Sequence, residues 1–362
     1  MKIGFIGLGL IGGSIARAIR HFYPEAEILA FSRTRASVEQ AVADGIVNRT
    51  PNEINEDFGS CDYIFLCAPV ASNAEYLQKL KPVIRLSSII TDVGSTKCDI
   101  HARVTELDME ANFIGGHPMT GSEKTGYMHS KRILIENAYY VITPTSRVSK
   151  DAVDRYYHFI ASLKALPLVL DYQTHDYVTA GISHLPHIIA SSLVNLVKDT
   201  DTEDGIMKLV AAGGFKDITR IASSSPEMWE QICMTNRKNI SSILNDYIQS
   251  LIEIRRQLDN AEAGAVYELF ESSRNYRNSL PVKGSGPIQR IFEIYCDMVD
   301  EAGGIATLAT ILASNQINLK NIGIIHSREF IEAVLRIEFY DEQAMKQAID
   351  ILRRYRYVIY ER

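Results

Sequence analysis

Hydrophobic positions in the first 170 residues form short apolar runs, separated by stretches with the spacing of amphipathic helices. The runs that predict buried strands cover residues 2–6, 28–31, 62–67, 88–92, 112–114, 139–142 and 167–170. Between them, the apolar positions of residues 14–20 and 72–80 recur at helical intervals. Alternating strands and helices are typical of a doubly wound α/β domain with a largely parallel sheet, and we assign this domain to residues 1–170.

The pattern changes at residue 171, after which apolar positions recur at helical spacing as far as residue 280. One stripe includes Val178, Ile182 and Leu185. Pro186 interrupts it, which favours a kink or a first-turn position for the proline. No run approaches 18 consecutive apolar residues, so we expect no transmembrane span. A helical domain this apolar is expected to form a homodimer interface.

Residues 275–287 are rich in asparagine, serine, proline and glycine, as in a linker between domains. Beyond this linker, residues 288–362 show a strand–helix–strand–strand–helix–strand order. The predicted strands cover residues 290–297, 319–326, 333–339 and 358–360, and the predicted helices cover residues 305–313 and 341–354. This order predicts a separate C-terminal domain with a ferredoxin-like βαββαβ arrangement.

The composition of the 362-residue chain is ordinary for a soluble globular protein, with 46% hydrophobic and 23% charged residues. Its net charge of −6 and its lack of a basic block argue against binding to nucleic acid. The five cysteines are an odd number without C-x-x-C spacing, which indicates reduced thiols in a cytoplasmic protein. The N-terminal apolar run continues directly into a glycine motif, so we expect no secretory signal.

The first predicted strand is followed directly by the glycine-rich loop Gly7-Leu8-Gly9-Leu10-Ile11-Gly12 and then by a helix. This order is the fingerprint of dinucleotide binding. Gly7 makes the turn, Gly9 lets the backbone approach a pyrophosphate, and Gly12 lets helix and strand pack closely. The helix N-terminus supplies free N–H groups to the phosphates. All six loop residues are therefore candidate cofactor contacts.

The residue that selects between NAD and NADP is expected about 20 positions after the glycine motif, at the end of the second strand. This position holds Ser32, followed by Arg33, Thr34 and Arg35, and no carboxylate stands there to repel a 2′-phosphate. Two guanidinium groups and two hydroxyls suit a ribose 2′-phosphate, so the sequence favours NADP over NAD. Alternatively, Arg33 and Arg35 are solvated side chains at the start of a helix.

Three further predicted strands end in segments suited to ligand contact, namely Cys67-Ala68-Pro69, Gly94-Ser95 and Gly116-His117. Ligands of open parallel sheets bind beyond the carboxyl ends of the strands, so we expect these segments to converge on one crevice. The glycines before His117 permit close packing, and an imidazole held there is a candidate general base. For a histidine taken alone, an ordinary loop position is the simpler interpretation.

Three histidines, His175, His184 and His187, lie close together in the predicted helical region. Their spacing is poor for a zinc site, so we predict no metal. Arg220 is suited to hold a carboxylate through two hydrogen bonds, although a surface salt bridge is the simpler role for an isolated arginine. Trp229 is the only tryptophan, and core packing is its simplest role.

Five motifs, in order over residues 1 to about 280, resemble prephenate dehydrogenase. They are the glycine loop, Asp92-Val-Gly-Ser95-x-Lys97, Gly116-His117-Pro118-Met119-x-Gly121-x-Glu123, Ser183-His184-Leu185-Pro186-His187 and Gly213-Gly214-Phe215-x-Asp217-x-Thr219-Arg220. The resemblance implies oxidation of the ring hydroxyl of prephenate with loss of its ring carboxylate, which gives 4-hydroxyphenylpyruvate for tyrosine synthesis. It also implies His117 as the catalytic base, Ser95 as its helper and Arg220 as the group that binds the substrate carboxylate. The implied substrate-lining residues are Ser122, Ser183, His184, His187 and Trp229.

Two positions depart from the family pattern. Ser32 stands where relatives often carry an aspartate, which leaves the cofactor choice open, and Thr120 stands where many carry alanine. Three alternatives remain: arogenate as the substrate, a 3-hydroxyacid dehydrogenase, and a nucleotide-binding regulator without turnover. A 3-hydroxyacid dehydrogenase would be expected to present a lysine base in the helical domain, whereas the motif here centres on His117. In a regulator, Ser95, His117 and Arg220 would have no common purpose.

The C-terminal module, residues 288–362, resembles an ACT domain, including Asp300-x-x-Gly303-Gly304-Ile305 at its first turn. ACT domains commonly pair side by side and bind an amino acid near that turn. The resemblance implies L-tyrosine as a feedback effector that contacts Asp300, Gly303, Gly304 and Ile305. Alternatively, the module forms a dimer and binds no ligand.

Overall fold

The computed structural model describes residues 1–121, 124–280, 292–297, 303–325 and 334–360. Contacts within the chain divide its described residues into two compact units, one that contains residues 1–280 and one that contains residues 292–360. The first unit holds both the α/β region and the helical region, so its internal contacts define the candidate site.

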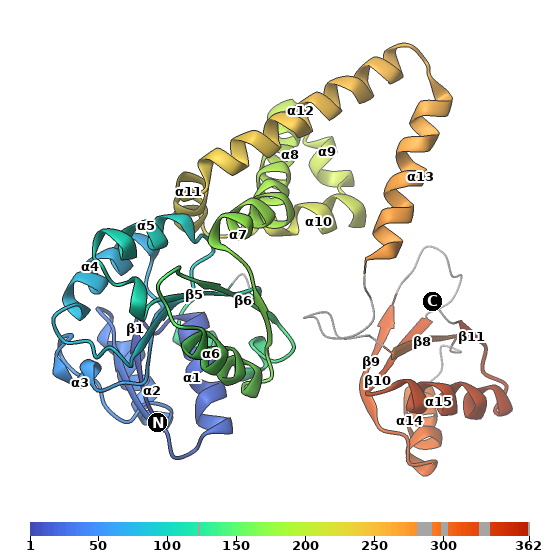
Figure 1. The fold of residues 1–362 in the computed structure, drawn as a ribbon. Helices are drawn as coiled ribbons and strands as arrows, with labels where there is room; N and C mark the ends of the chain where they lie inside the picture. Colours follow the sequence, from blue (N-terminus) through green and yellow to red (C-terminus); the bar gives the residue numbers. More distant parts are fainter. Residues whose placement is uncertain (122–123, 281–291, 298–302, 326–333, 361–362) are drawn as a thin grey trace. The chain divides into compact units, whose positions relative to one another are not determined.

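The N-terminal sheet contains four parallel strands in the order β2-β1-β3-β4 (Figure 1). They are β1 (Lys2–Ile6), β2 (Glu27–Phe31), β3 (Tyr63–Leu66) and β4 (Ile89–Asp92), and the helices that connect or follow them are α1 (Leu10–Phe22), α2 (Arg35–Ala43), α3 (Glu56–Gly59), α4 (Val70–Leu80) and α5 (Cys98–Glu106). Side chains of α1 and α2 cover the face that carries Phe5, and side chains of α3, α4 and α5 cover the face that carries Ile6. The predicted doubly wound α/β arrangement is confirmed.

A second, three-stranded sheet continues beyond β4. It consists of β5 (Ile114–Pro118), β6 (Tyr139–Pro144) and β7 (Leu166–Val169), with α6 (Lys150–Ser162) between β6 and β7. β5 runs antiparallel to β6, β6 runs parallel to β7, and a parallel bridge between Ile90 and Phe113 joins the two sheets.

The strand predicted at residues 112–114 was placed too early in the chain, because β5 covers Ile114–Pro118. Residues 110–112 form a short 3₁₀ turn, and the strand is the Gly-Gly-His-Pro run itself. The glycines explain this placement, because a Cβ atom on Gly116 would lie 2.6 Å from the carbonyl oxygen of Asp92 and 2.7 Å from the hydroxyl of Tyr140. Only glycine lets β5 approach β4 this closely, and His117 therefore sits in a strand rather than in a loop.

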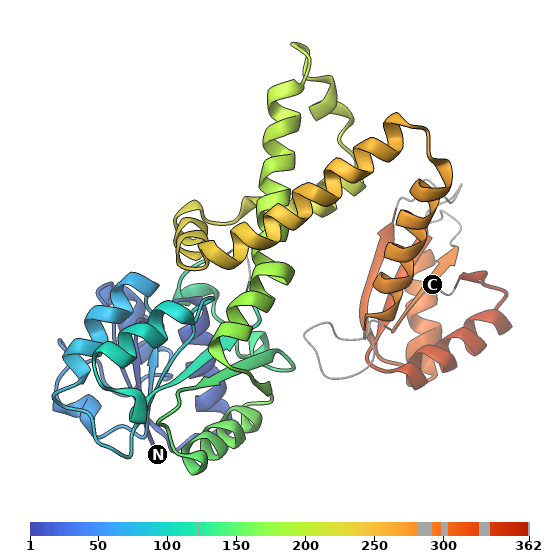
Figure 2. The same cartoon turned by 45° about the horizontal axis from the view of Figure 1, so that its top comes forward.

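The helical region begins at α7 and extends to the end of α13, as predicted (Figure 2). Its helices are α7 (Tyr172–Thr179), α8 (Leu185–Thr200), α9 (Ile206–Val210), α10 (Gly213–Thr219), α11 (Pro226–Thr235), α12 (Arg237–Asp259) and α13 (Ala263–Ser279). A π-helical turn, Ala180–His184, joins α7 to α8, and Pro186 lies directly after it in the first turn of α8, one of the two positions predicted for it. Because α13 extends to Ser279, the predicted linker begins as helix, and residues 281–287 lie outside the described part of the chain.

The continuous helical segment Tyr172–Thr200 is long and apolar enough to cross a membrane, although the count of consecutive apolar residues predicted no such span. The difference arises because serine, threonine and histidine interrupt the apolar runs without adding charge. Only 22% of its most apolar window is buried within the chain, and Ile182 and Leu196 are exposed. Most of this apolar surface is therefore not covered by the residues that the structure describes.

The C-terminal unit forms a four-stranded antiparallel sheet in the order β11-β8-β10-β9. Its elements are β8 (Phe292–Asp297), α14 (Gly304–Ser314), β9 (Leu319–Ile325), β10 (Val334–Phe339), α15 (Glu342–Arg354) and β11 (Ile359–Tyr360). Both helices pack on one face of the sheet, where Ile294, Leu308 and Leu352 are buried together. The other face is polar and includes an ion pair of 2.6 Å between Arg336 and Glu293. The predicted βαββαβ order of elements is confirmed.

Candidate functional site

The glycine loop between β1 and α1 has the shape expected of a dinucleotide cradle. Gly7 has a φ of +87°, and a Cβ atom there would lie 2.7 Å from the backbone nitrogen of Ala68. A Cβ atom on Gly12 would lie 2.9 Å from the Cβ of Cys67, whereas one on Gly9 would meet no heavy atom within 4 Å. The first and third glycines are therefore needed for packing, and the second faces open space. These residues fit a bound pyrophosphate at the N-terminus of α1.

The segment predicted to select the cofactor lies beside this loop. The backbone nitrogen of Gly7 donates a 2.7 Å hydrogen bond to the carbonyl of Phe31, the last residue of β2. Arg33, Thr34 and Arg35 follow and are exposed. Arg33 donates a 3.3 Å hydrogen bond to the hydroxyl of Ser72 near the start of α4. The two arginines are thus placed in solvent at the edge of the nucleotide loop.

A buried ion pair between Asp92 and Lys97 closes the end of β4. The carboxylate of Asp92 also accepts hydrogen bonds from the backbone nitrogens of Gly94, at 2.9 Å, and Gly116, at 3.1 Å. It therefore ties the end of β4 to β5. The half-buried Ser95 lies inside the loop that this network holds.

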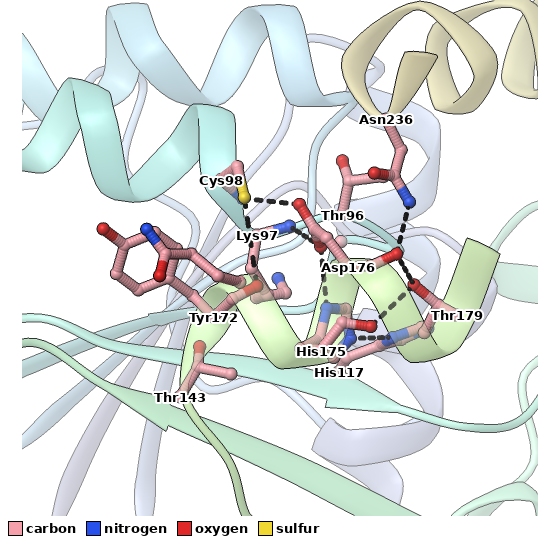
Figure 3. Close-up of polar contacts among 12 residues, drawn as sticks. Thr96, Lys97, Cys98, His117, Thr143, Tyr172, His175, Asp176, Thr179 and Asn236 are labelled. Carbon is pink, nitrogen blue, oxygen red and sulfur yellow. Dashed lines mark hydrogen bonds and ion pairs between the residues drawn. The ribbon is translucent and has the colours of Figure 1, made fainter. Parts of the chain in front are cut away.

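His117 is the first member of a chain of side-chain hydrogen bonds that passes from β5 to α7 (Figure 3). Its Nδ1 lies 2.8 Å from Nε2 of His175, and Nδ1 of His175 lies 2.8 Å from Oδ1 of Asp176. The carboxylate of Asp176 then accepts hydrogen bonds from the backbone nitrogens of Lys97, at 2.7 Å, and Cys98, at 2.8 Å. The chain therefore ends on the first amides of α5, two residues beyond Ser95.

Burial and nearby charges set the ionisation of both ends of this chain. Burial is the largest cause that holds the pKa of His117 well below its usual value, so the imidazole is neutral at pH 7. Burial opposes ionisation of Asp176, but the hydrogen bonds from His175, Cys98 and Lys97 outweigh it and hold the pKa of this carboxyl below its usual value. A neutral imidazole and an ionised carboxylate thus stand at the two ends.

The predicted residues of the helical region form a second cluster. His187 stacks on Trp229 with ring centres 3.7 Å apart, and His184 meets the same indole edge-on at 5.9 Å. Nδ1 of His187 donates a 2.9 Å hydrogen bond to the carbonyl oxygen of Ser183. His184 also joins the first cluster, because its Nδ1 lies 3.1 Å from the side-chain nitrogen of Asn236, which donates to the backbone carbonyl of Asp176.

This second cluster borders a cavity of about 440 Å³ between α8 and α11, lined in part by His187 and Trp229. The indole N–H of Trp229 is buried and has no hydrogen-bond partner among the described residues. Burial is the largest cause that lowers the pKa of His187, and the charge of Arg220 also lowers it. Trp229 is half-buried and stacked on a histidine, so the prediction of simple core packing was incomplete.

The structure brings His117, His184, His187 and Trp229 into one continuous network of contacts. Among the other predicted residues, Ser122 and Asp300 lie outside the described part of the chain, and Gly303, Gly304 and Ile305 belong to the C-terminal unit. In the described ranges, no group of three or more histidine, cysteine or acidic side chains is arranged to hold a metal ion.

Sequence reasoning missed His175 and Asp176. His175 was considered only as a candidate zinc ligand, and the adjacent Asp176 was not assigned a role. The available signal was an adjacent His-Asp pair in the first turns of a helix that follows a strand. That signal is weak, because the partner positions on β5 and α5 become visible only in three dimensions.

Two family models match the chain. The nucleotide-binding domain of prephenate dehydrogenase matches residues 15–168, and the dimerization domain of prephenate dehydrogenase matches residues 171–272. The prephenate dehydrogenase of Bacillus subtilis (strain 168) is 36% identical over 347 residues, which are 94% of this chain and 93% of that protein. The prephenate dehydrogenase of Lactococcus lactis subsp. cremoris is 32% identical and covers 98% of both chains.

Solved structures agree with this relationship. A prephenate dehydrogenase from A. aeolicus, in complex with hydroxyphenyl propionate and NAD+, has a TM-score of 0.73 and 28% identity, over 78% of this chain and 98% of that chain. Synechocystis arogenate dehydrogenase has a TM-score of 0.70 and 28% identity, over 78% of this chain and all of its own. Neither family model extends past residue 272 into the C-terminal unit. The chain belongs to the prephenate dehydrogenase family of NAD-dependent oxidoreductases.

Proposed function

We propose that this protein catalyses the oxidative decarboxylation of prephenate to 4-hydroxyphenylpyruvate, with hydride transfer to a nicotinamide dinucleotide, as a step of L-tyrosine synthesis. The observation that carries the proposal is the state of His117, a buried imidazole that is neutral at pH 7 and is held in the same unit as the dinucleotide loop. A general base must be unprotonated at working pH and fixed in position, and His117 meets both conditions.

In this mechanism, His117 removes the proton from the ring hydroxyl of the substrate, and the hydroxyl of Ser95 hydrogen-bonds to the same oxygen. The bound dinucleotide supplies the hydride acceptor for the ring carbon that carries this hydroxyl. Departure of the proton and the hydride leaves a ring carbonyl. The bond to the ring carboxylate then breaks, CO2 leaves, and the electron pair completes the aromatic ring. The protein itself needs to accept one proton.

The second cluster is proposed to bind and orient the substrate. Arg220 would hold a substrate carboxylate, and Ser122, Ser183, His184, His187 and Trp229 would line the remainder of the substrate. The buried indole N–H of Trp229 supports this assignment, because a buried donor is expected to have an acceptor when its site is filled. Arginine is suited to the role, since its planar fork matches a carboxylate.

Prephenate is preferred over arogenate in this proposal. His187 is either neutral or cationic, so in neither state does it offer a negative charge to the ammonium group of arogenate. Similarity to an arogenate dehydrogenase at 28% identity keeps arogenate as the second candidate.

NADP is the preferred cofactor in this proposal. Ser32 and Thr34 present hydroxyls, and the exposed Arg33 and Arg35 present guanidinium groups, beside a glycine loop that fits a dinucleotide. The loop residues Leu8, Leu10 and Ile11 and the segment Cys67-Ala68-Pro69 would complete the cofactor site, together with Ser95. NAD is the alternative, and the similar A. aeolicus enzyme binds NAD+.

The test is a steady-state assay of the purified full-length protein with prephenate and with arogenate, each against NAD+ and NADP+. We expect the highest kcat/KM with prephenate and NADP+, and Arg33→Gln should lower kcat/KM with NADP+ while leaving that with NAD+ unchanged. Turnover of arogenate alone would establish the alternative substrate, and a large preference for NAD+ would overturn the cofactor assignment. Absence of turnover with all four combinations would refute the proposed function.

The C-terminal unit is proposed to be an ACT domain that binds L-tyrosine as a feedback inhibitor. Gly303 has a φ of +94° at the start of α14, which forms the turn where such domains bind amino acids. We expect L-tyrosine to inhibit the wild-type protein, and Gly303→Val to weaken this inhibition because a β-branched residue is strained at positive φ. Gly323→Ala is the matched control, because Gly323 has open space around its Cα. Absence of inhibition in the wild type would leave dimerisation as the role of this unit.

We further propose a cytoplasmic homodimer in which the exposed apolar side chains of α8 and its neighbours are buried against a second copy. The matched dimerization model covers this helical region, and exposed residues such as Ile182, Leu209 and Phe270 would otherwise face water. Light scattering of the purified protein in the absence of detergent tests this assignment. A monodisperse dimer supports it, whereas a requirement for detergent would favour a membrane role for the same helix.

A further inference from the structure

We propose that His175 and Asp176 are positioning residues that fix the tautomer of His117, so that Nε2 of His117 carries the lone pair that accepts the substrate proton. The inference rests on the role of His117 in the proposed function and extends it. It adds two residues that lie outside all five sequence motifs through which the family was recognised.

The direction of each hydrogen bond in the chain is assigned from the carboxylate of Asp176, which is the acceptor at the end of the chain. The carboxylate of Asp176 is held ionised and accepts two backbone N–H groups, so it accepts from His175 as well, and Nδ1 of His175 must carry a hydrogen. Nε2 of His175 faces Nδ1 of His117 at 2.8 Å, so one of these two nitrogens donates to the other. With hydrogen on Nδ1 of His175, we assign Nε2 of His175 as the acceptor and Nδ1 of His117 as the donor. This leaves the lone pair on Nε2, which has no hydrogen-bond partner among the described residues.

The arrangement also stabilises the product of the proton transfer. After His117 accepts the proton at Nε2, its imidazolium still donates through Nδ1 to His175, and the negative charge of Asp176 lies at the end of the chain. This charge opposes the ammonium group of Lys97, although Asp92 partly neutralises that group. The other titratable groups around His117 are His184 on the π-helical turn and Tyr140 on β6.

Substitution of His175 tests the chain without touching the base itself. His175→Phe keeps a ring and removes both nitrogens, so kcat should fall by about 10²-fold while KM for prephenate changes little. His175→Gln retains an acceptor near the position of Nε2 and should recover part of this loss. Thr179→Val is the matched control, because the Thr179 hydroxyl is equally buried and bonds only to the backbone carbonyls of His175 and Asp176. This control should retain kcat within a few-fold of wild type.

The pH profile separates positioning from mere structural support. Loss of the Asp176 charge in Asp176→Asn destabilises the imidazolium of His117, so the acid limb of the kcat profile should move to lower pH and the plateau should fall. A purely structural role would lower the plateau, or the yield of folded protein, without moving the limb. Unchanged kcat and an unchanged limb in both His175→Phe and Asp176→Asn would overturn the proposal.

A measurement on the wild-type protein keeps the proposal testable if these variants do not fold. In protein labelled with ¹⁵N-histidine, the His117 signal, identified by its absence in His117→Asn, should report hydrogen on Nδ1 and a bare Nε2 above neutral pH. The opposite tautomer would refute the inference. If His117→Asn itself remained fully active, the proposed mechanism would fail. If that variant were inactive and the His175 and Asp176 variants behaved as wild type, only the positioning roles would fail.

Discussion

The two clusters of the candidate site differ in how completely their polar groups are satisfied. In the cluster of His117, His175 and Asp176, the side chains are buried and bonded in sequence to one another and to the start of α5. In the cluster of His187 and Trp229, the rings are half-buried, border a cavity, and include an indole N–H without a partner in the described ranges. In the proposed mechanism, the first cluster would serve proton transfer, because its groups are already held in place, and the second would bind the substrate, because its indole N–H is left for an acceptor.

This contrast predicts that substitutions in the first cluster act on kcat and substitutions in the second act on KM. The largest effect is expected for His117→Asn. Asparagine retains a polar side chain of smaller volume but supplies no base, so kcat should fall by up to about 10⁴-fold. Binding of the dinucleotide, measured by titration calorimetry, should remain near normal, because the glycine loop is not altered.

His101→Asn provides the control for this first prediction. His101 is also buried, but its Nε2 lies 3.0 Å from the hydroxyl of Thr143 and its ring stacks on Tyr172, so it belongs to the packing of α5 rather than to the proton path. Its substitution should cost stability and leave kcat of the folded protein within a few-fold of wild type. Full activity of His117→Asn would contradict the mechanism.

The next largest effect is expected for Arg220→Gln. Loss of a guanidinium that binds a substrate carboxylate should raise KM for prephenate by about 100-fold, which corresponds to about 2.7 kcal/mol, with a smaller change in kcat. Arg220→Lys should give an intermediate KM, because lysine keeps the charge and loses the fork geometry. If Arg220→Gln lowered kcat and left KM unchanged, the proposal that the first cluster serves catalysis and the second serves substrate binding would be wrong.

The same contrast explains what could be predicted from the sequence. Strands, helices and the glycine loop follow from local periodicity and from the steric freedom of glycine, and these predictions were confirmed for the α/β region, the helical region and the βαββαβ unit. His117 was predicted as the base at the crevice; the structure buries it, its role stays a prediction, and the strand that carries it was misplaced. The glycines were predicted to permit close packing, and they do so within β5, against β4.

The partners of His117 could not be found in the same way. His175 and Asp176 are 58 and 59 residues farther along the chain, and their link to His117 depends on how α7 packs on β5 and α5. Likewise, His187 on α8 stacks on Trp229 on α11. The two residues are far apart in the sequence, and a local hydrophobic pattern does not predict a contact between them. Local patterns therefore predicted the elements and proposed His117 as the base, whereas the surroundings of His117 depend on tertiary packing.

A third prediction concerns pH and stability. Burial lowers the pKa of His101 and of His184 to about 4, from an ordinary value of 6.5. Between these values the unfolded chain binds more protons than the folded protein, so stability is fully present above pH 6.5 and is lost as the pH falls towards 4. We expect Tm, measured by calorimetry, to fall through this window, and His101→Phe to reduce the slope. A Tm that is constant from pH 6.5 to 4 would contradict the burial of these neutral rings.

The smallest effect is expected for Trp229→Phe. Phenylalanine retains a ring that can stack on His187 and removes only the indole N–H, so the loss is limited to one hydrogen bond to a ligand. KM for prephenate should rise by about 5-fold and kcat should stay within a factor of two, because a single net hydrogen bond contributes about 1 kcal/mol. Steady-state kinetics of this variant, with Trp229→Leu as a comparison that also removes the stacking, measures the two contributions separately. A fall in kcat without a rise in KM would show that the indole acts on the proton transfer through His184, which it meets edge-on, and that the second cluster is an extension of the first.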